Sequence, residues 1–264
     1  MKHIILYLLI FVTAKFSSAQ TLSCEEMEIN LRNEYMKILE FHGKNNYDSL
    51  EIQNKTFLKT LNFYTQYFPE TITYPFKSLT DSFEFNIVLS EDSLFRIYNW
   101  NTWTGGTWFS FKCLYQFKNK GDIYSLYYDD NDSIHTLSYG ASYSEIFTLK
   151  ANDKIYYLGI EDATYSSRDC NQYIKIFRID NGLLDDTIKL IKTKTRIRNR
   201  LGFNYDFFSV ANRPERPVKL ISYDSQTKTI NIPVVLENGK VTNKFIHYKF
   251  TGQYFEKVNI KKHK

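Results

Sequence analysis

All three tryptophans of the chain fall within one nine-residue segment, 100–108, together with three threonines and a Gly-Gly pair. Tryptophan offers a large apolar face and one N–H donor, a combination that is enriched at binding surfaces. Glycines and threonines add backbone and hydroxyl groups suited to a polar ligand such as a sugar. The alternative interpretation is a hairpin whose aromatic rings clamp the core or cover the helices expected at the N-terminus. The candidate ligand-binding set is Trp100, Trp103, Thr104, Thr107, Trp108 and Arg168.

Basic residues alternate strictly with other residues between positions 192 and 200. Side chains two apart on a β-strand point to the same face, so the pattern predicts a strip of five positive charges. Such a strip favours an anionic partner, and we expect a glycan or another anionic envelope component rather than nucleic acid. The alternatives are an edge strand guarded against pairing with other chains, or a strip that faces acidic residues of the same molecule. The candidate polyanion-binding set is Lys192, Lys194, Arg196, Arg198 and Arg200.

Signatures of enzymes and metal sites are few. No two histidines have the spacing of a zinc-binding helix, and no Gly-x-Ser-x-Gly segment is present. The oxygen-rich run Asp129–Ser133 lacks the Gly and Glu that a calcium loop needs at its sixth and twelfth positions, so it predicts an acidic turn. We therefore predict no catalytic residue, no metal and no cofactor.

The chain has three cysteines. Cys113 and Cys170 both fall in the part rich in strand patterns, so we take them as a candidate disulfide that an oxidising compartment would permit. Cys24 follows Thr21-Leu22-Ser23, a poor match to the segment that precedes a lipidated cysteine. An outer-membrane lipoprotein anchored through Cys24 is therefore not expected.

Two segments of the chain resemble a group of secreted proteins of Bacteroidota bacteria. The first is the run Arg96-Ile-Tyr-Asn-Trp100, which leads into Thr102-Trp-Thr-Gly-Gly-Thr107. The second is the closing run Tyr248-Lys-Phe-Thr-Gly252-Gln-Tyr-Phe255. The group has no assigned activity, so the resemblance implies a compartment and not a function.

These candidate residues need elements to position them, and the first elements are helical. Apolar residues recur at helical spacing from Cys24 to Tyr67, and Gly43-Lys-Asn-Asn46 interrupts them. Asp48 or Ser49 is suited to cap a second helix, and Pro69 to stop it. Residues 20–70 are thus predicted to form a helical hairpin docked on the rest of the protein.

Residues 71–264 predict an all-β domain. Short runs rich in Ile, Val, Tyr and Phe alternate there with turns such as Asp180-Asn-Gly182 and Asn238-Gly239. The spacing of about a dozen strands favours an antiparallel meander, propeller-like in its groups of four, with a barrel or a sandwich as alternatives. The fold class is therefore mainly β, preceded by the helical hairpin.

The segment 1–19 has the pattern of a signal peptide. Lys2 precedes an apolar run, Ile4–Val12, and small residues end at Ala19. The run is shorter than the roughly 20 residues that span a bilayer, and no later run reaches that length. We expect cleavage after Ala19 and a secreted or periplasmic product without a transmembrane segment.

Charge is divided unevenly along the expected mature chain. Residues 20–185 contain 15 Lys/Arg against 23 Asp/Glu, whereas residues 186–264 contain 17 against 6. Such a division either marks a surface for an acidic partner or lets the two parts attract each other. Together these features predict a non-catalytic binding or interaction protein of the bacterial cell envelope. A hydrolase of envelope or extracellular polymers and a structural envelope component are the alternatives.

Overall fold

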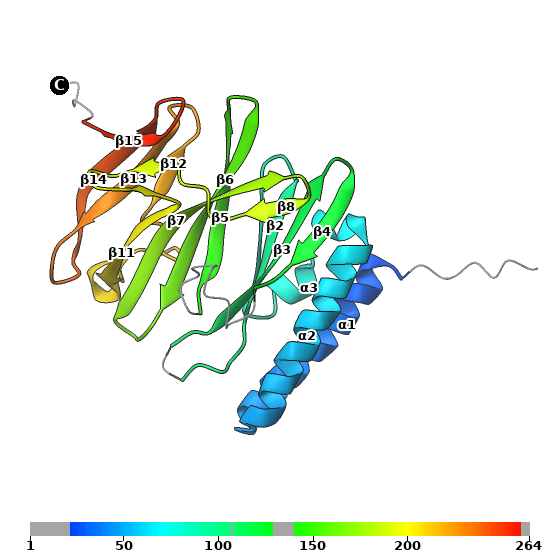
Figure 1. Ribbon diagram of the computed structural model, residues 1–264. Coiled ribbons are helices and arrows are strands. Elements are labelled where there is room, and N and C mark those ends of the chain that lie inside the picture. Colours follow the sequence, from blue (N-terminus) through cyan, green and yellow to red (C-terminus); the bar gives the residue numbers. More distant parts are fainter. Residues whose placement is uncertain (1–21, 107, 129–139, 260–264) are drawn as a thin grey trace, which may run out of the picture.

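The computed structural model describes residues 22–106, 108–128 and 140–259. The predicted signal segment 1–19, Thr107 and the acidic run 129–133 lie outside these ranges. Two long helices come first and three β-sheets follow (Figure 1). Within the described residues, no helix combines the length and the apolar character needed to cross a membrane.

Local sequence explains the boundaries of the two long helices, α1 (Cys24–Gly43) and α2 (Tyr47–Tyr67). The Ser23 side chain accepts a hydrogen bond from the Glu26 N–H, and the Glu26 carboxylate accepts one from the Ser23 N–H, which is a complete capping box. The prediction of Asp48 or Ser49 as the cap of α2 is wrong. The cap is Asn46, whose side-chain oxygen accepts a hydrogen bond from the Ser49 N–H. The helix ends two residues before Pro69, as predicted.

The strands form three sheets. Sheet 1 has the order β1-β2-β3-β4, with β1 (Phe85–Leu89), β2 (Phe95–Asn101), β3 (Phe111–Asn119) and β4 (Asp122–Leu126). Sheet 2 has the order β11-β7-β6-β5, with β5 (Ser142–Ala151), β6 (Lys154–Thr164), β7 (Asp169–Asp180) and β11 (Arg200–Asp206), and β8 (Leu183–Asp185) pairs with β7. Sheet 3 has the order β10-β9-β15-β14-β13-β12, with β9 (Ile191–Lys192), β10 (Ile197–Arg198), β12 (Ser222–Asp224), β13 (Thr229–Val235), β14 (Val241–Phe250) and β15 (Phe255–Val258). Three short helices, η1 (Pro69–Ile72), α3 (Lys77–Thr80) and η2 (Phe207–Ser209), lie between these elements.

The two long helices, sheet 1, sheet 2 and sheet 3 are stacked in that order (Figure 1). Trp100 and Tyr98 of sheet 1 pack in one core cluster with the two long helices. The opposite face of sheet 1 contributes Phe95 to a second cluster with Phe177 of sheet 2. A third cluster joins the other face of sheet 2 to sheet 3. Sheet 2 is therefore the middle sheet, and both of its faces are covered.

The chain is mainly β with two N-terminal helices, as predicted. Among the described strands, the pairs are antiparallel except for the parallel pair β15–β9. The finer expectation of a propeller-like ring, with a barrel or sandwich as alternatives, is not shown by this stack and stays a prediction.

One face of sheet 2 carries charged side chains inside the protein. Lys175 of β7 is fully buried, and its Nζ lies 2.6 Å from Oδ2 of Asp186, which is also buried. Glu161 of β6 is fully buried and pairs with Arg200 of β11 at 2.7 Å. Buried charges of this kind are tolerated only when they are paired.

The other face of sheet 2 carries Asp162, which is partly buried. Its two carboxylate oxygens contact Ser144 Oγ at 2.5 Å and Gln172 Nε2 at 2.6 Å. Gln172 Nε2 also donates to the carbonyl of Val218, and so joins Asp162 to the segment that leads into β12. Burial raises the pKa of the Asp162 carboxyl to about 7, and the nearby Glu161 and Glu145 charges act in the same direction.

Candidate functional site

The tryptophans nearest sheet 1 hold the helices in place. Trp100 is fully buried, and its Nε1 donates to Asn54 Oδ1 of α2 at 3.2 Å. The Nε1 of Trp103 donates to the Tyr35 hydroxyl of α1 at 3.2 Å, and the indole packs on His42. The structure thus gives these two residues the alternative role stated above, packing between the helices and sheet 1. Trp100 in particular is out of reach of a ligand.

The remainder of the tryptophan segment is held by contacts within itself. The Thr104 hydroxyl lies 2.8 Å from the Thr102 hydroxyl and 3.3 Å from that of Ser110. Trp108 is half-buried, and a Cβ added to Gly105 would meet its carbonyl oxygen at 2.2 Å. Glycine at position 105 therefore permits the close turn, and Thr107 lies outside the described residues.

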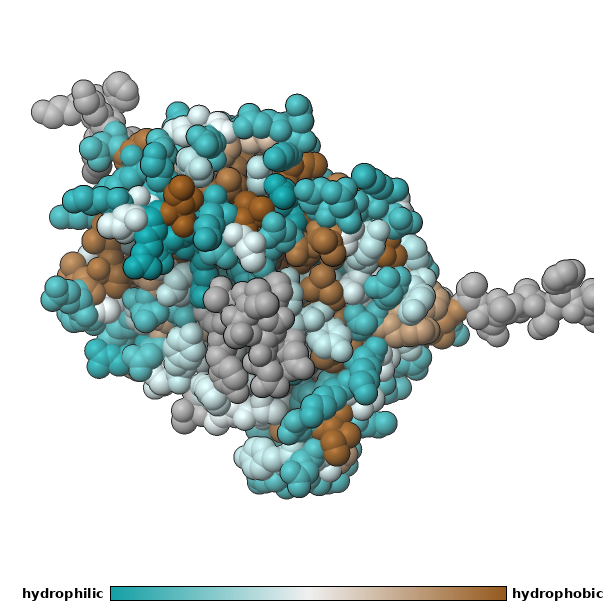
Figure 2. Space-filling view, in the orientation of Figure 1, coloured by the Kyte–Doolittle hydropathy of each residue, from teal (hydrophilic) through white to brown (hydrophobic). Residues whose placement is uncertain are grey.

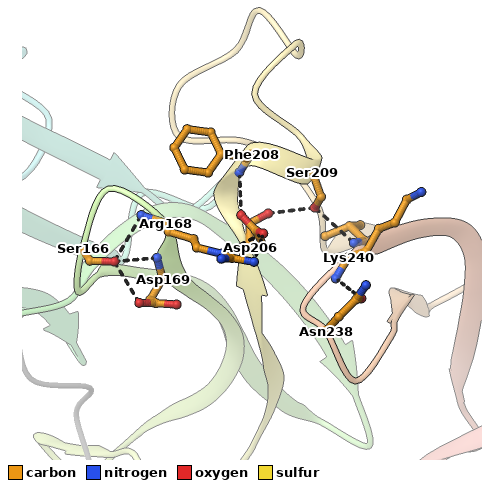
Figure 3. Close-up of polar contacts among 9 residues, drawn as sticks. Ser166, Arg168, Asp169, Asp206, Phe208, Ser209, Asn238 and Lys240 are labelled. Atoms are coloured by element: carbon orange, nitrogen blue, oxygen red, sulfur yellow. Dashed lines mark hydrogen bonds and ion pairs between the residues drawn. The ribbon is translucent and has the colours of Figure 1, made fainter.

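Arg168 lies in the turn between β6 and β7 and connects this turn to β11 of the same sheet (Figure 3). Its Nε and one terminal nitrogen lie 2.9 and 2.8 Å from Asp206 Oδ2 of β11. Asp206 also accepts from the Phe208 N–H with its other oxygen, and its backbone N–H donates to Gly239. The guanidinium is thus engaged in tying the β6–β7 turn to β11. The tryptophan segment approaches this turn where the Phe109 N–H donates to the Thr164 carbonyl at 3.2 Å, and Arg168 itself pairs with Asp206.

The predicted disulfide between Cys113 and Cys170 is not formed, and all three cysteines are free thiols. The Cys113 Sγ lies on sheet 1 and donates to Asn99 Oδ1 at 3.3 Å. The Cys170 Sγ lies on sheet 2 and contacts the Thr164 hydroxyl at 3.8 Å. Both cysteines do lie on strands, as predicted, but the strands belong to different sheets, so the two sulfur atoms do not meet. Burial raises the pKa of both thiols, which keeps them protonated.

The basic segment is not the continuous strand that its alternation predicts. The chain turns back between β9 and β10, where the Thr193 N–H donates to the Arg196 carbonyl and Ile197 pairs with Lys192. After β10 it crosses to sheet 2, where Arg200 begins β11. β10 is an edge strand of sheet 3 and β11 is an edge strand of sheet 2. The guard role at exposed edges, stated above as an alternative, therefore fits the position of these residues.

Four of the five predicted bases nevertheless line one cavity of about 830 Å³, which we call the basic cavity. Its walls come from the β9–β10 hairpin, from β11 with its neighbour β7, and from β14 and β15. Arg196 is not among the lining residues, whereas Lys257 of β15 is. Figure 2 shows hydrophilic side chains gathered with smaller apolar patches over this part of the surface. The lining residues are Tyr173, Lys192, Thr193, Lys194, Thr195, Arg198, Arg200, Leu201, Gly202, Tyr248, Glu256 and Lys257.

The bases of the basic cavity fall into two kinds. Lys192 pairs with Glu256 at 2.7 Å, and hydrogen bonding to that carboxylate raises the pKa of Lys192. Arg200 is engaged with the buried Glu161. By contrast, within the described part of the chain Lys194, Arg198 and Lys257 have no acidic partner within ion-pair distance. The cavity therefore keeps a positive balance of lining side chains that internal ion pairs do not cancel.

The floor of the cavity, formed by β7 and β11, is closely packed. The Arg200 guanidinium lies over the Tyr173 ring at 3.7 Å, and the Glu161 carboxylate holds it there. Gly202 lies opposite Tyr173 in the β11–β7 pair, and a Cβ at this position would meet the Gln172 carbonyl at 2.1 Å and the Tyr173 ring at 2.6 Å. A glycine is therefore required for the close approach that forms this floor.

The chemistry available in the basic cavity is binding of negative charge. Among the described residues of its lining, one is a carboxylate, Glu256, which is already paired with Lys192. Hydrolysis of glycosidic bonds generally needs two carboxylates, and these described residues supply no second one. Among the residues that the structure describes, no cluster of three or more His, Cys, Asp or Glu side chains is arranged to hold a metal ion.

No protein-family model, curated protein or solved structure matches the chain. The functional interpretation therefore rests on the cavity itself. Sequence reasoning found the hairpin bases but missed Tyr173, Tyr248 and Lys257, which lie up to 65 positions from Lys192. The alternation of basic residues at 192–200 does not indicate which distant strands lie beside this segment in the fold.

Proposed function

We propose that this protein is a non-catalytic binding protein of the bacterial cell envelope or exterior, and that its basic cavity takes an anionic ligand. The observation that supports the proposal is the gathering of Lys192, Lys194, Arg198, Arg200 and Lys257 around one cavity. Clefts lined by one sign of charge concentrate ligands of the opposite sign. The compartment follows from the signal pattern of residues 1–19 and from the resemblance to secreted Bacteroidota proteins, and it is part of the proposal.

Two ion pairs bear on the alternative that the uneven charge is cancelled internally. Arg200 pairs with Glu161, and Lys219 with Glu145, and each joins a base of the C-terminal part to an acid of the N-terminal part. Lys194, Arg198 and Lys257 take no such partner among the described residues. A cavity that retains unpaired bases after these contacts supports an external anion.

The test compares two arginines of the same hairpin. Arg198 lines the basic cavity, whereas Arg196 is exposed in the turn and does not line it. We expect Arg198→Gln to elute from a heparin column at lower salt than the wild-type protein. Arg196→Gln removes the same charge two residues away, and it should elute close to the wild-type position.

Equal elution of the two variants would show that retention follows net charge and not the cavity, and would count against the proposal. Unchanged retention together with self-association of Arg198→Gln in size-exclusion chromatography would instead support the role of this base in guarding the edge strand β10.

A further inference from the structure

The unpaired bases of the basic cavity are spread over its walls. Lys194 lies in the β9–β10 turn, Arg198 in β10 and Lys257 in β15. β9 lies between β10 and β15 in sheet 3, so Arg198 and Lys257 stand on either side of it. Three bases set apart in this way match a ligand that carries several anionic groups along its length, and not a single small anion.

The surface between these bases is neither charged nor wholly apolar. Thr193 and Thr195 contribute hydroxyl groups, Leu201 an aliphatic side chain and Gly202 bare backbone. A sugar ring presents hydroxyl groups at its rim and C–H groups on its faces, which such a surface complements. The volume of about 830 Å³ lies within the range of ligand-binding clefts.

The same surface is poorly suited to nucleic acid. Binding of single strands depends on free aromatic faces on which bases stack. One face of the Tyr173 ring is covered by the Arg200 guanidinium at 3.7 Å, and Tyr248 is only 8% exposed. A duplex is read by a protruding helix or ribbon that enters a groove, whereas this site is concave.

From these features we infer that the ligand of the basic cavity is an anionic polysaccharide, bound through Lys194, Arg198 and Lys257. The inference rests on the proposed anion-binding function and adds the class of ligand and the contact residues. Lys192 and Arg200 are not assigned as ligand contacts, because they already form ion pairs with Glu256 and Glu161. Their role is to shape the cavity.

The experiment measures fluorescence anisotropy of a labelled uronic-acid oligosaccharide and of a labelled oligothymidylate of equal charge. We expect the oligosaccharide to bind about tenfold tighter, because the cavity offers the bases no free stacking face. Lys257→Gln should weaken oligosaccharide binding about fivefold. Lys244→Gln, which removes an exposed base of β14 outside the cavity, should leave it unchanged. Circular dichroism of each variant confirms that it is folded.

Inorganic polyphosphate separates this inference from the proposed function. If polyphosphate displaces the oligosaccharide as well as an unlabelled oligosaccharide of equal charge does, the site reads charge alone. The polysaccharide inference then falls while the anion-binding function stands. Tighter binding of oligothymidylate would overturn the inference in favour of nucleic acid. Failure of all three anions to bind at low salt would overturn both. Wild-type affinity of Lys257→Gln would refute the contact set.

Discussion

Asp162 should make the protein less stable as the pH rises from about 4 to about 7. Burial raises the pKa of its carboxyl from 3.8 to about 7 in the folded state. Below pH 4 the group is protonated in both states and contributes nothing. Between pH 4 and 7 the carboxyl ionises in the unfolded chain but stays protonated in the folded protein. Ionisation therefore stabilises the unfolded state only, and the free energy of unfolding falls as the pH rises. Above pH 7 the loss is complete.

The size of the effect follows from the pKa difference. Each pKa unit corresponds to about 1.4 kcal/mol, which gives about 4 kcal/mol for the full difference. Because Asp162 is partly exposed and solvent screens its charge, we expect roughly 2–4 kcal/mol. Asp162→Asn keeps an acceptor for Gln172 and places a donor beside Ser144, but it does not titrate. The free energy of unfolding of this variant, measured relative to that of the wild type, should therefore increase by roughly 2–4 kcal/mol between pH 4 and pH 7.

Urea denaturation of both proteins at several pH values across this window measures the gain. Asp224→Asn is the control, because Asp224 is exposed and hydrogen bonds from Thr227 lower the pKa of its carboxyl. Stability linked to a lowered pKa is lost only at more acidic pH, so the difference between this control and the wild type should be flat above pH 5. A flat difference for Asp162→Asn as well would refute the reasoning, since it would mean that Asp162 is ionised throughout.

Two further predictions concern the layers. Trp100→Ala should leave a cavity between α2 and sheet 1 and lower the free energy of unfolding by about 3–5 kcal/mol. The control is Phe208→Ala, at a side chain that is 65% exposed, which should change the free energy of unfolding by less than about 0.5 kcal/mol. Chemical denaturation measures both variants, and equal effects would contradict the packing role of Trp100. Lys175→Met should lower the free energy of unfolding by about 3–5 kcal/mol at neutral pH, because it leaves Asp186 charged, buried and without its lysine. The double variant Lys175→Met/Asp186→Leu should recover most of this loss in the same denaturation assay. No recovery in the double variant would show that the lysine acts through other contacts.

Much of the fold could be predicted because local signals and tertiary packing agree. The capping box at Ser23, the break before α2 and the Asn-Gly turn that precedes β14 each specify a boundary within a few residues. The prediction failed where the chain changes layer. At 192–200 the alternation has the period of one strand, but the backbone folds into a hairpin and then enters a different sheet. The period describes the faces of a strand and not how long the strand runs.

The candidate site could be predicted only in part. The hairpin bases were visible because they are neighbours in sequence, whereas Lys257 and Tyr173 reach the cavity through the pairings β15–β9 and β11–β7. Such pairings bring together segments that share no local pattern. Trp100 carried a signal that two roles share, since a large aromatic residue suits a binding surface and a core equally well. Its burial against α2 decides between them.

The buried pair Lys175–Asp186 has a consequence for how sheet 2 assembles. Both faces of this sheet are covered, so apolar burial alone does little to distinguish the two faces of β7 during folding. A slip of β7 by one residue along β6 would turn Lys175 towards the aliphatic cluster around Ile160 and Ile174 and away from Asp186. The lysine therefore penalises misaligned pairing, and we infer that it sets the alignment of the sheet more than its strength. A double variant, Lys175→Met/Asp186→Leu, that is stable but shows extra amide signals in its NMR spectrum would reveal the misaligned form, and a single set of signals would argue against this role.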